Sequence, residues 1–306
     1  MNQDFKLPSE LTIPDLIKTL RELCWGASDI LKAYARGEQP PYGFSRVLSV
    51  KDNGKGPVSA ADLAVNKWLL DGFNSYYPDI DWKILSEETS ENFNNSYSSF
   101  DNKLLWILDP LDGTKDFLSG TGEYAVHLAL VENNRPKLGI VLIPEREELW
   151  FGISGLGSWC EDRNQNRKEV SFNSKKNIND LILVTSRSHR DQRLENLISS
   201  LNFSSSKAVG SVGCKIATIL RGEADVYISL SAKTAPKDWD MAAPEALLIS
   251  AGGCFTHADQ SNLKYNQSDN LQAGCLIASN GFIHEDICKE SLLSLKNIDP
   301  NFQFYK

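Results

Sequence analysis

Residues 104–116 of the chain read LLWILDPLDGTKD. Five apolar residues, typical of a β-strand, run directly into Asp109 and, three residues later, Asp112. Pro110 stiffens the turn between these acids and lacks a backbone N–H, and Gly113 lets the backbone approach a ligand closely. Two carboxylates at one strand end favour a divalent-cation site, because hard cations prefer oxygen ligands. A solvated turn with aspartate caps is the simpler alternative.

Thr114 and Lys115 follow the glycine and open a short predicted helix. The unpaired backbone N–H groups at a helix start suit a phosphate oxygen. Carboxylates alone would repel a phosphate, whereas carboxylates that hold divalent cations would not. The stretch therefore predicts a site in which metal ions lie between acidic side chains and a phosphorylated ligand.

Three further acids lie at a strand end or a helix start. Glu87 follows a strand-like run, and Asp62 and Asp240 lie in the first turns of two predicted helices. Each has a plain structural alternative, because an acidic pair after a strand is usually a solvated loop and helix starts favour acids. Taken singly they indicate little, but together with residues 104–116 they indicate one acidic site.

The composition narrows the class of protein. The chain has 306 residues, of which 41% are apolar and 24% charged, and this excludes a disordered, collagen-like or coiled-coil chain. Its net charge of −8 argues against a nucleic-acid polymer as partner. No apolar run approaches the about 18 residues that span a membrane, and the N-terminus does not resemble a signal peptide. Six scattered cysteines without a CxxC pair predict buried free thiols and a cytoplasmic protein.

Hydrophobic periodicity predicts two kinds of organisation along the chain. Amphipathic helices are expected over residues 10–36 and 60–73, with a loop or irregular hairpin over 38–58. Strands follow, and the last three form an antiparallel meander; they are 82–85, 104–108, 124–131, 138–143 and 148–153. A polar stretch predicts a boundary between parts 1–166 and 167–306. Beyond it strands (181–185, 224–229, 275–278) alternate with helices (191–200, 214–221, 240–250 and a last one), which predicts α/β layering.

The four acidic segments together resemble the inositol monophosphatase superfamily of Mg²⁺-dependent, lithium-sensitive phosphatases, which includes 3′(2′),5′-bisphosphate nucleotidases. Residues 109–114 (DPLDGT) and 239–244 (WDMAAP) are similar to its two signatures, in the expected order and separation. The resemblance runs from about residue 10 to the last predicted helix. It implies an α/β protein whose layers form an αβαβα sandwich.

The bisphosphate nucleotidase branch is the closer match. Lys115 follows Thr114, residues 186–189 read SRSH, and residues 209–215 read VGSVGCK, all in the style of that branch. Ser59 stands where threonine is usual, and keeps the hydroxyl. The resemblance implies a set of substrate-binding residues: Gly113, Thr114, Lys115, Ser188, His189, Ser211 and Lys215.

The resemblance also implies how the acids work. Two or three Mg²⁺ ions would be held by Glu87, Asp109, Asp112, Asp240 and the backbone carbonyl of Leu111. Asp62, with the hydroxyl of Thr114, would orient or deprotonate the attacking water.

The expected reaction is hydrolysis of 3′-phosphoadenosine 5′-phosphate to AMP and phosphate, with 3′-phosphoadenylyl sulfate as a second substrate. The expected partner is thus a small phosphorylated nucleotide, not a nucleic-acid polymer or a membrane. Two alternatives stay open: an inositol-phosphate or sugar-phosphate phosphatase of the same superfamily, and a catalytically weak metal-dependent nucleotide sensor.

Overall fold

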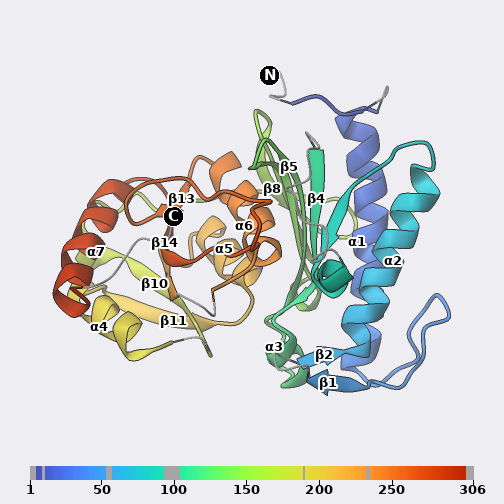
Figure 1. Cartoon of the computed structure of the whole chain (residues 1–306), viewed down its shortest axis with the longest axis horizontal. Helices are drawn as coiled ribbons and strands as arrows, with labels where there is room; N and C mark the ends of the chain where they lie inside the picture. The colour runs from blue at the N-terminus through green and yellow to red at the C-terminus, as the bar shows by residue number, and fades with distance from the viewer. Residues whose placement is uncertain are drawn as a thin grey trace.

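Helices and sheets alternate through the molecule in five layers (Figure 1). The computed structural model describes residues 5–8, 11–52, 57–92, 104–188, 190–231 and 235–300. Three pairs of helices make the outer, middle and opposite outer layers: α1 (Ile13–Ala35) with α2 (Ala60–Tyr76), α5 (Val212–Leu220) with α6 (Asp238–Ser250), and α4 (Gln192–Leu201) with α7 (His284–Ile298). Two sheets separate these pairs, so the predicted αβαβα sandwich is confirmed.

The first helix pair forms where the sequence places its apolar stripes. Leu16, Leu20 and Leu23 of α1 are buried at helical spacing, and the Thr12 hydroxyl caps the helix by accepting the N–H of Asp15 at 3.3 Å. The cap explains why α1 begins at Ile13, three residues later than predicted. α2 begins at the predicted residue and runs three residues further.

The first sheet has seven strands in the order β3-β4-β5-β6-β7-β8-β9. Their bounds are β3 Ile84–Ser86, β4 Leu104–Asp112, β5 Ala125–Glu132, β6 Arg135–Ile143, β7 Glu148–Ile153, β8 Gly157–Glu161 and β9 Arg167–Glu169. Strands β4 to β9 pair antiparallel, which confirms the meander, and β3 lies parallel to β4. Along β4, Trp106 packs in the core with α1 and α2, whereas Ile107 packs in the core with α5 and α6.

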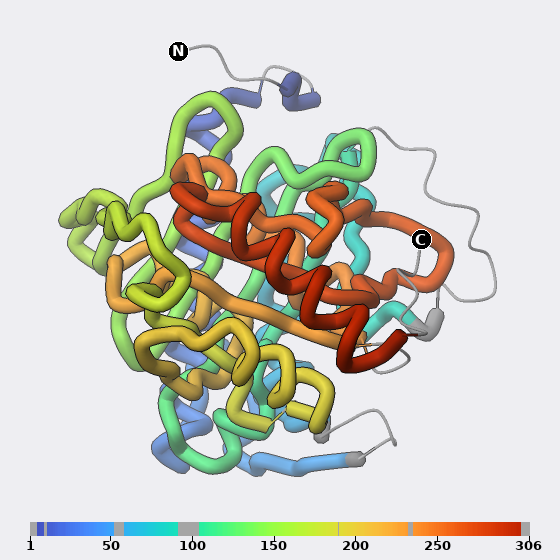
Figure 2. Tube along the Cα trace, turned by 90° about the vertical axis from the view of Figure 1, so that its left-hand side faces the viewer, coloured from blue at the N-terminus to red at the C-terminus, as the bar shows by residue number. Residues whose placement is uncertain are grey.

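The second sheet is mixed and has the order β11-β10-β12-β14-β13. Its bounds are β10 Ile182–Ser186, β11 Ser205–Val209, β12 Val226–Ser231, β13 Cys254–His257 and β14 Gly274–Ser279. β10 pairs parallel with β11 and β12, and β14 pairs antiparallel with both of its neighbours. Seen from the side, α4 and α7 lie together over its outer face (Figure 2).

Two glycines let α6 approach the first sheet closely. A Cβ at Gly139 of β6 would lie 2.5 Å from Cβ of Ala246, and one at Gly152 of β7 would lie 2.5 Å from Cα of Leu247. Only a residue without a side chain fits at this distance. A helix from the second half of the chain therefore packs directly on the first sheet, with its N-terminal end toward β4 and β5.

Other sequence-based expectations can be located in the fold. The segment predicted as a loop or irregular hairpin contains the antiparallel pair β1 (Val50–Asp52) and β2 (Pro57–Ser59). β9 belongs to the first sheet, and β10 is the first strand of the second sheet along the chain. The predicted boundary between parts 1–166 and 167–306 stays a prediction. All six cysteines are unpaired and five are buried, as expected.

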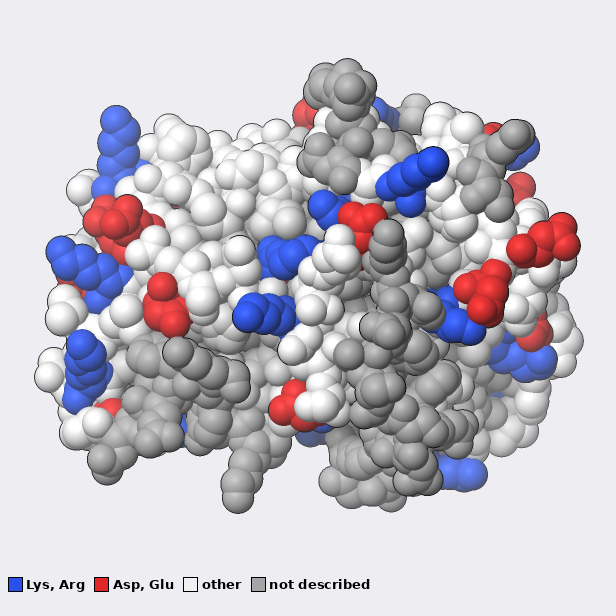
Figure 3. Space-filling model, turned by 45° about the horizontal axis from the view of Figure 1, so that its top comes forward, with Lys and Arg blue, Asp and Glu red and all other residues white. Residues whose placement is uncertain are grey.

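Charged side chains of both signs are interspersed over the described part of the face in Figure 3, so acids do not gather there in one patch. None of the helices in the described ranges has both the length and the apolar composition needed to cross a membrane.

Candidate active site

A β-bulge brings Asp109 and Asp112 to the same face of the first sheet. In a regular strand, residues three apart point to opposite faces. Here Asp109 pairs with His127 and Asp112 with Ala125, so three steps along β4 match only two along β5. The extra residue compensates for the odd spacing, and Pro110 is tolerated within the bulge because no ladder hydrogen bond is needed there.

Asp240 joins these two aspartates from the first turn of α6. One carboxylate oxygen from each of Asp109, Asp112 and Asp240 lies within 4.8 Å of the other two. Oδ2 of Asp240 accepts the backbone N–H of Lys237 at 2.6 Å, in a capping box that fixes the side chain against its own helix. The predicted convergence of the two signature segments is therefore present in the fold.

Asp112 is held by α5 and by β5. Its Oδ2 accepts the Ser211 hydroxyl at 2.6 Å and the backbone N–H of Val212 at 2.5 Å. Nε2 of His127 lies 3.4 Å from the same oxygen. His127 is fully buried, and the sequence did not indicate it, because a lone histidine in an apolar strand carries no motif.

Asp62 and Thr114 meet as the resemblance implies. The Asp62 carboxylate completes a capping box at the start of α2, accepting the N–H of Ser59 at 2.9 Å and its hydroxyl at 2.5 Å. Its other oxygen, Oδ1, accepts the hydroxyl of Thr114 at 3.1 Å, and that hydroxyl also lies 3.2 Å from the carbonyl oxygen of Leu111. Ser59 thus fixes a carboxylate that points toward the bulge in β4.

Glu87 comes directly after β3, the strand parallel to β4, and begins a short 3₁₀ helix (Glu87–Asn92). Because parallel strands end at the same edge of a sheet, this position brings Glu87 to the end of β4 that carries the aspartates. Burial raises the pKa of Glu87 well above its usual value, and the charges of Asp240, Glu88 and Asp62 raise it further. The predicted fourth acid therefore belongs to the same electrostatic cluster.

The acids of the cluster raise one another's pKa values. Burial raises the pKa of Asp109 well above its usual value, and the charges of Glu87 and Asp112 add to the effect. Burial and the charge of Asp112 raise the pKa of Asp240 to about 7. Like charges held together away from water disfavour ionisation. Glu87, Asp109 and Asp240 therefore experience repulsion from neighbouring acids, and the charge of Lys237 only partly offsets it at Asp240.

This donor set fits magnesium. Mg²⁺ prefers carboxylate, carbonyl and water oxygens and is usually held by only a few protein carboxylates. A divalent cation among Asp109, Asp112 and Asp240 would replace their mutual repulsion by attraction. The carbonyl of Leu111, in the bulge between two of these aspartates, is a neutral oxygen of the same kind.

The residues implied to bind substrate have different surroundings. Gly113 has a φ of +91°, which favours glycine, and a Cβ there would lie 3.2 Å from the carbonyl oxygen of Glu123. Lys115 in α3 (Thr114–Leu118) and Ser188 are exposed. The run that contains Ser188 lies beside α3, since Nε of Arg187 is 3.2 Å from Oδ1 of Asp116. His189 lies outside the described residues.

Ser211 and Lys215 point into the protein. Ser211 is buried and donates its hydroxyl to Asp112. Lys215 is only 3% exposed, its ammonium donates to the carbonyl of Gly210, and it lies 5.5 Å from the ring centroid of Tyr227. Burial lowers the pKa of Lys215, and the charge of Asp112 opposes that change. Lys215 is therefore not the surface cation that a helix-start lysine usually is, and its contact with substrate stays a prediction.

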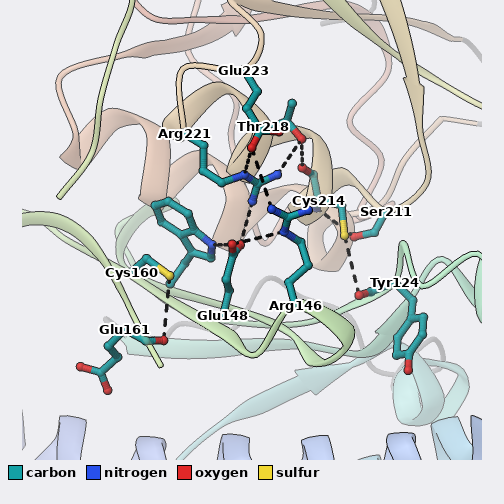
Figure 4. A network of polar contacts seen from close by, with 11 residues as sticks. Tyr124, Arg146, Glu148, Cys160, Glu161, Ser211, Cys214, Thr218, Arg221 and Glu223 are labelled. Carbon is teal, nitrogen blue, oxygen red and sulfur yellow. Dashed lines mark hydrogen bonds and ion pairs between the residues drawn. The ribbon is translucent and has the colours of Figure 1, made fainter. Parts of the chain in front are cut away.

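The opposite end of α5 is fixed by a buried acid with cationic partners (Figure 4). Glu148 of β7 accepts Nη1 of Arg221 at 2.7 Å, Nε of Arg146 at 3.2 Å and the indole N–H of Trp150 at 3.0 Å. The Arg221 guanidinium also donates to the hydroxyl of Thr218, at 3.1 Å. The helix that touches Asp112 is therefore anchored at both ends.

Comparisons with known proteins agree with this geometry. The profile of the inositol monophosphatase family matches residues 14–294. The 3′(2′),5′-bisphosphate nucleotidase CysQ of Buchnera aphidicola is 33% identical over 222 residues, or 70% of this chain and 76% of that protein. CysQ of Escherichia coli K12 is 29% identical over 231 residues, or 76% of this chain and 86% of that protein.

Solved structures show the same fold at lower identity. The IMPase of Thermotoga maritima has a TM-score of 0.71 at 23% identity and covers 93% of this chain and 99% of its own. An IMPase/NADP phosphatase complexed with Mg²⁺ and phosphate has a TM-score of 0.72 at 20% identity, covering 97% and 100%. With the family profile spanning nearly all of its length, the chain belongs to the inositol monophosphatase family.

Proposed function

We propose that this protein is a Mg²⁺-dependent 3′(2′),5′-bisphosphate nucleotidase that hydrolyses 3′-phosphoadenosine 5′-phosphate to AMP and phosphate. The observation that carries the proposal is the cluster of Asp109, Asp112 and Asp240 beside the Asp62–Thr114 pair. The relatives named as bisphosphate nucleotidases support this choice of substrate over others in the family.

Glu87, Asp109, Asp112, Asp240 and the carbonyl of Leu111 would hold two or three Mg²⁺ ions. Bound there, the ions would supply Lewis-acid stabilisation of the charge that develops on the transferring phosphoryl group. The protein's part is to hold the acids together at the cost of their mutual repulsion. It does so with the β4 bulge and with the capping box of α6.

Asp62 and Thr114 would handle the attacking water. The single hydrogen of the Thr114 hydroxyl is directed at Asp62 and the Leu111 carbonyl, so its oxygen can accept a hydrogen bond from a water. Burial raises the pKa of Asp62, although the hydrogen bonds from Ser59 oppose the change. A raised pKa makes a carboxylate a better proton acceptor near neutral pH. Asp62 would thereby orient the water and take its proton.

The turn at the end of β4 would bind the phosphoryl group. Gly113, in a left-handed conformation, is the N-cap of α3 there. The N–H groups of Gly113 and Thr114 would donate to phosphoryl oxygens. Lys115, Ser188, His189 and Lys215 would bind the remainder of the nucleotide, and 3′-phosphoadenylyl sulfate would be a second substrate.

The proposal is tested by comparing phosphate release from three substrates with and without Mg²⁺. These are 3′-phosphoadenosine 5′-phosphate, inositol 1-phosphate and fructose 1,6-bisphosphate. We expect release only with Mg²⁺, and the highest kcat/KM for the nucleotide. A higher kcat/KM for either of the others would assign the protein to another activity of the family, and no release from any substrate would favour a nucleotide sensor.

A further inference from the structure

Three groups converge on a single oxygen of Asp112. The hydroxyl of Ser211 and the N–H of Val212 donate to Oδ2, and Nε2 of His127 lies 3.4 Å from it. Contacts that all act on one oxygen restrict the rotation of the carboxylate and leave its other oxygen for a cation. Hydrogen-bond partners of this kind commonly tune how tightly a metal ligand binds.

The hydroxyl of Ser211 is fully used within the protein. A serine hydroxyl has one hydrogen to donate, and that of Ser211 is directed at Asp112. Its oxygen also accepts the N–H of Cys214, at 3.4 Å, as the N-cap of α5. A phosphate needs donors, and this side chain has none left to offer. Its geometry therefore supports a role behind the metal ligand better than the substrate contact that the resemblance implies.

His127 separates two segments that carry acids. Its Nδ1 lies 3.4 Å from the carbonyl oxygen of Trp239, the residue before Asp240, while its Nε2 faces Asp112. Gly213 makes room for the ring, because a Cβ at that position would lie 2.4 Å from Nε2. The imidazole thus lies between the β4 bulge and the start of α6, and it contacts a carboxylate of the one and a backbone carbonyl of the other.

We propose that Ser211 and His127 are positioning residues that orient Asp112 for Mg²⁺ binding, and that Ser211 does not contact the substrate. The inference rests on the metal site of the proposed function. It adds two residues that hold a ligand of that site in place. It also makes the first turn of α5 a physical link between the predicted substrate-binding segment 209–215 and the metal site. Loss of the Ser211 hydroxyl should therefore change metal affinity before any substrate is present.

The test is calorimetric titration of the substrate-free protein with Mg²⁺. We expect Ser211→Ala to weaken binding by about 10- to 100-fold, the usual effect of losing a partner of a metal ligand, and Ser211→Thr to restore it by returning the hydroxyl. Ser158→Ala is the matched control, because it removes another buried serine hydroxyl, bonded to the carbonyl of Phe151 at 2.8 Å. That variant should bind Mg²⁺ like the wild type.

His127→Leu is the second variant, because it removes a contact with the same Asp112 oxygen that comes from β5 and not from α5. It should weaken Mg²⁺ binding by less than Ser211→Ala does, since its contact is longer. Circular dichroism establishes that each variant is folded, and if Ser211→Ala is not, His127→Leu and Ser211→Thr decide the question.

Two results would overturn the inference and are distinguishable. If the wild type binds Mg²⁺ and Ser211→Ala or His127→Leu binds it equally well, these residues do not position Asp112. In that case, a higher KM of Ser211→Ala for the bisphosphate would indicate that Ser211 contacts the substrate. If the wild type itself does not bind Mg²⁺, the metal site of the proposed function fails as well.

Discussion

Buried acids occur in two contrasting settings in this protein. Asp225 is fully buried, and its carboxylate meets Nζ of Lys175 at 2.8 Å and the backbone N–H of Ile182 at 2.8 Å. Glu148 is matched in the same way by two arginines. Asp109, at 1% exposure, instead has other acids as its charged neighbours.

The difference separates structural acids from functional ones. A buried charge is tolerated when it is paired and hydrogen-bonded, and a paired acid needs nothing from outside. A carboxylate surrounded by other carboxylates is electrostatically unfavourable unless a cation is bound. Such clusters are typical of functional sites. The two settings should therefore respond differently to mutation and to Mg²⁺.

The largest effect is expected in the unpaired cluster. Asp112→Asn should reduce phosphate release from 3′-phosphoadenosine 5′-phosphate to background, because a metal ligand is lost. The unfolding free energy without Mg²⁺ should hold or rise, because one charge leaves a repulsive cluster. Activity assays and urea denaturation measure the two quantities. Normal turnover by the folded variant would contradict the metal-site assignment.

Asp62 lies beside the cluster, but its proposed task is to act on water. Asp62→Ala should lower kcat by about 10²- to 10⁴-fold, the scale of losing a positioned general base, while Mg²⁺ binding stays mostly intact. Steady-state kinetics and calorimetry together check this. If Mg²⁺ binding disappeared along with activity, Asp62 would be a ligand instead.

Removing the partner of a paired acid should lower the stability of the protein and leave catalysis little changed. Lys175→Met leaves the Asp225 charge buried without its cation, and the unfolding free energy should fall by about 3 kcal/mol. Mg²⁺ should not remove this deficit relative to the wild type, and kcat should be little changed. A variant whose deficit vanished at saturating Mg²⁺ would show that the two settings are not separate.

The smallest effect concerns Lys215, a cation buried close to the cluster. If its ammonium leaves the Gly210 carbonyl to bind the phosphate that is not cleaved, Lys215→Ala should raise KM for the bisphosphate by about 10- to 100-fold. KM for 3′-AMP, which lacks that phosphate, should hardly change. Equal changes in KM for both substrates would indicate that Lys215 only supports the loop at Gly210.

Much of this contrast could be read from the sequence. Asp62 and Asp240 lie in the first turns of helices, as predicted. Asp109 and Asp112 were expected in a turn after a strand that ended at residue 108, but β4 continues through its bulge to Asp112 because both aspartates pair with β5. The sequence did not predict β8, β9, β11 or β13, and two of these have weak local patterns. Ser205–Val209 (β11) has mostly exposed residues, and Cys254–His257 (β13) has only four, so tertiary pairing and not local preference makes them strands.

The supporting residues of the site could not be predicted, because their roles depend on contacts between distant segments. His127 is an ordinary position in an apolar strand until the β4 bulge and α6 are placed around it. Lys215 follows a helix start in the sequence, but the packing of α5 buries its side chain. The contacts of Ser211 with Asp112 and of His127 with Trp239 join residues 99 and 112 positions apart, and periodicity cannot detect contacts over such separations.

The central claim is that the unpaired cluster exists to hold divalent cations, and crystals of the protein soaked in Mn²⁺ test it most directly. Mn²⁺ prefers the same oxygen ligands as Mg²⁺, and its anomalous scattering locates it without assumptions about the chemistry. We predict strong anomalous peaks within coordination distance of Asp109, Asp112 and Asp240, and none beside Asp225 or Glu148. Absence of a peak among the three aspartates, in crystals whose soaked Mn²⁺ binds elsewhere, would contradict the account.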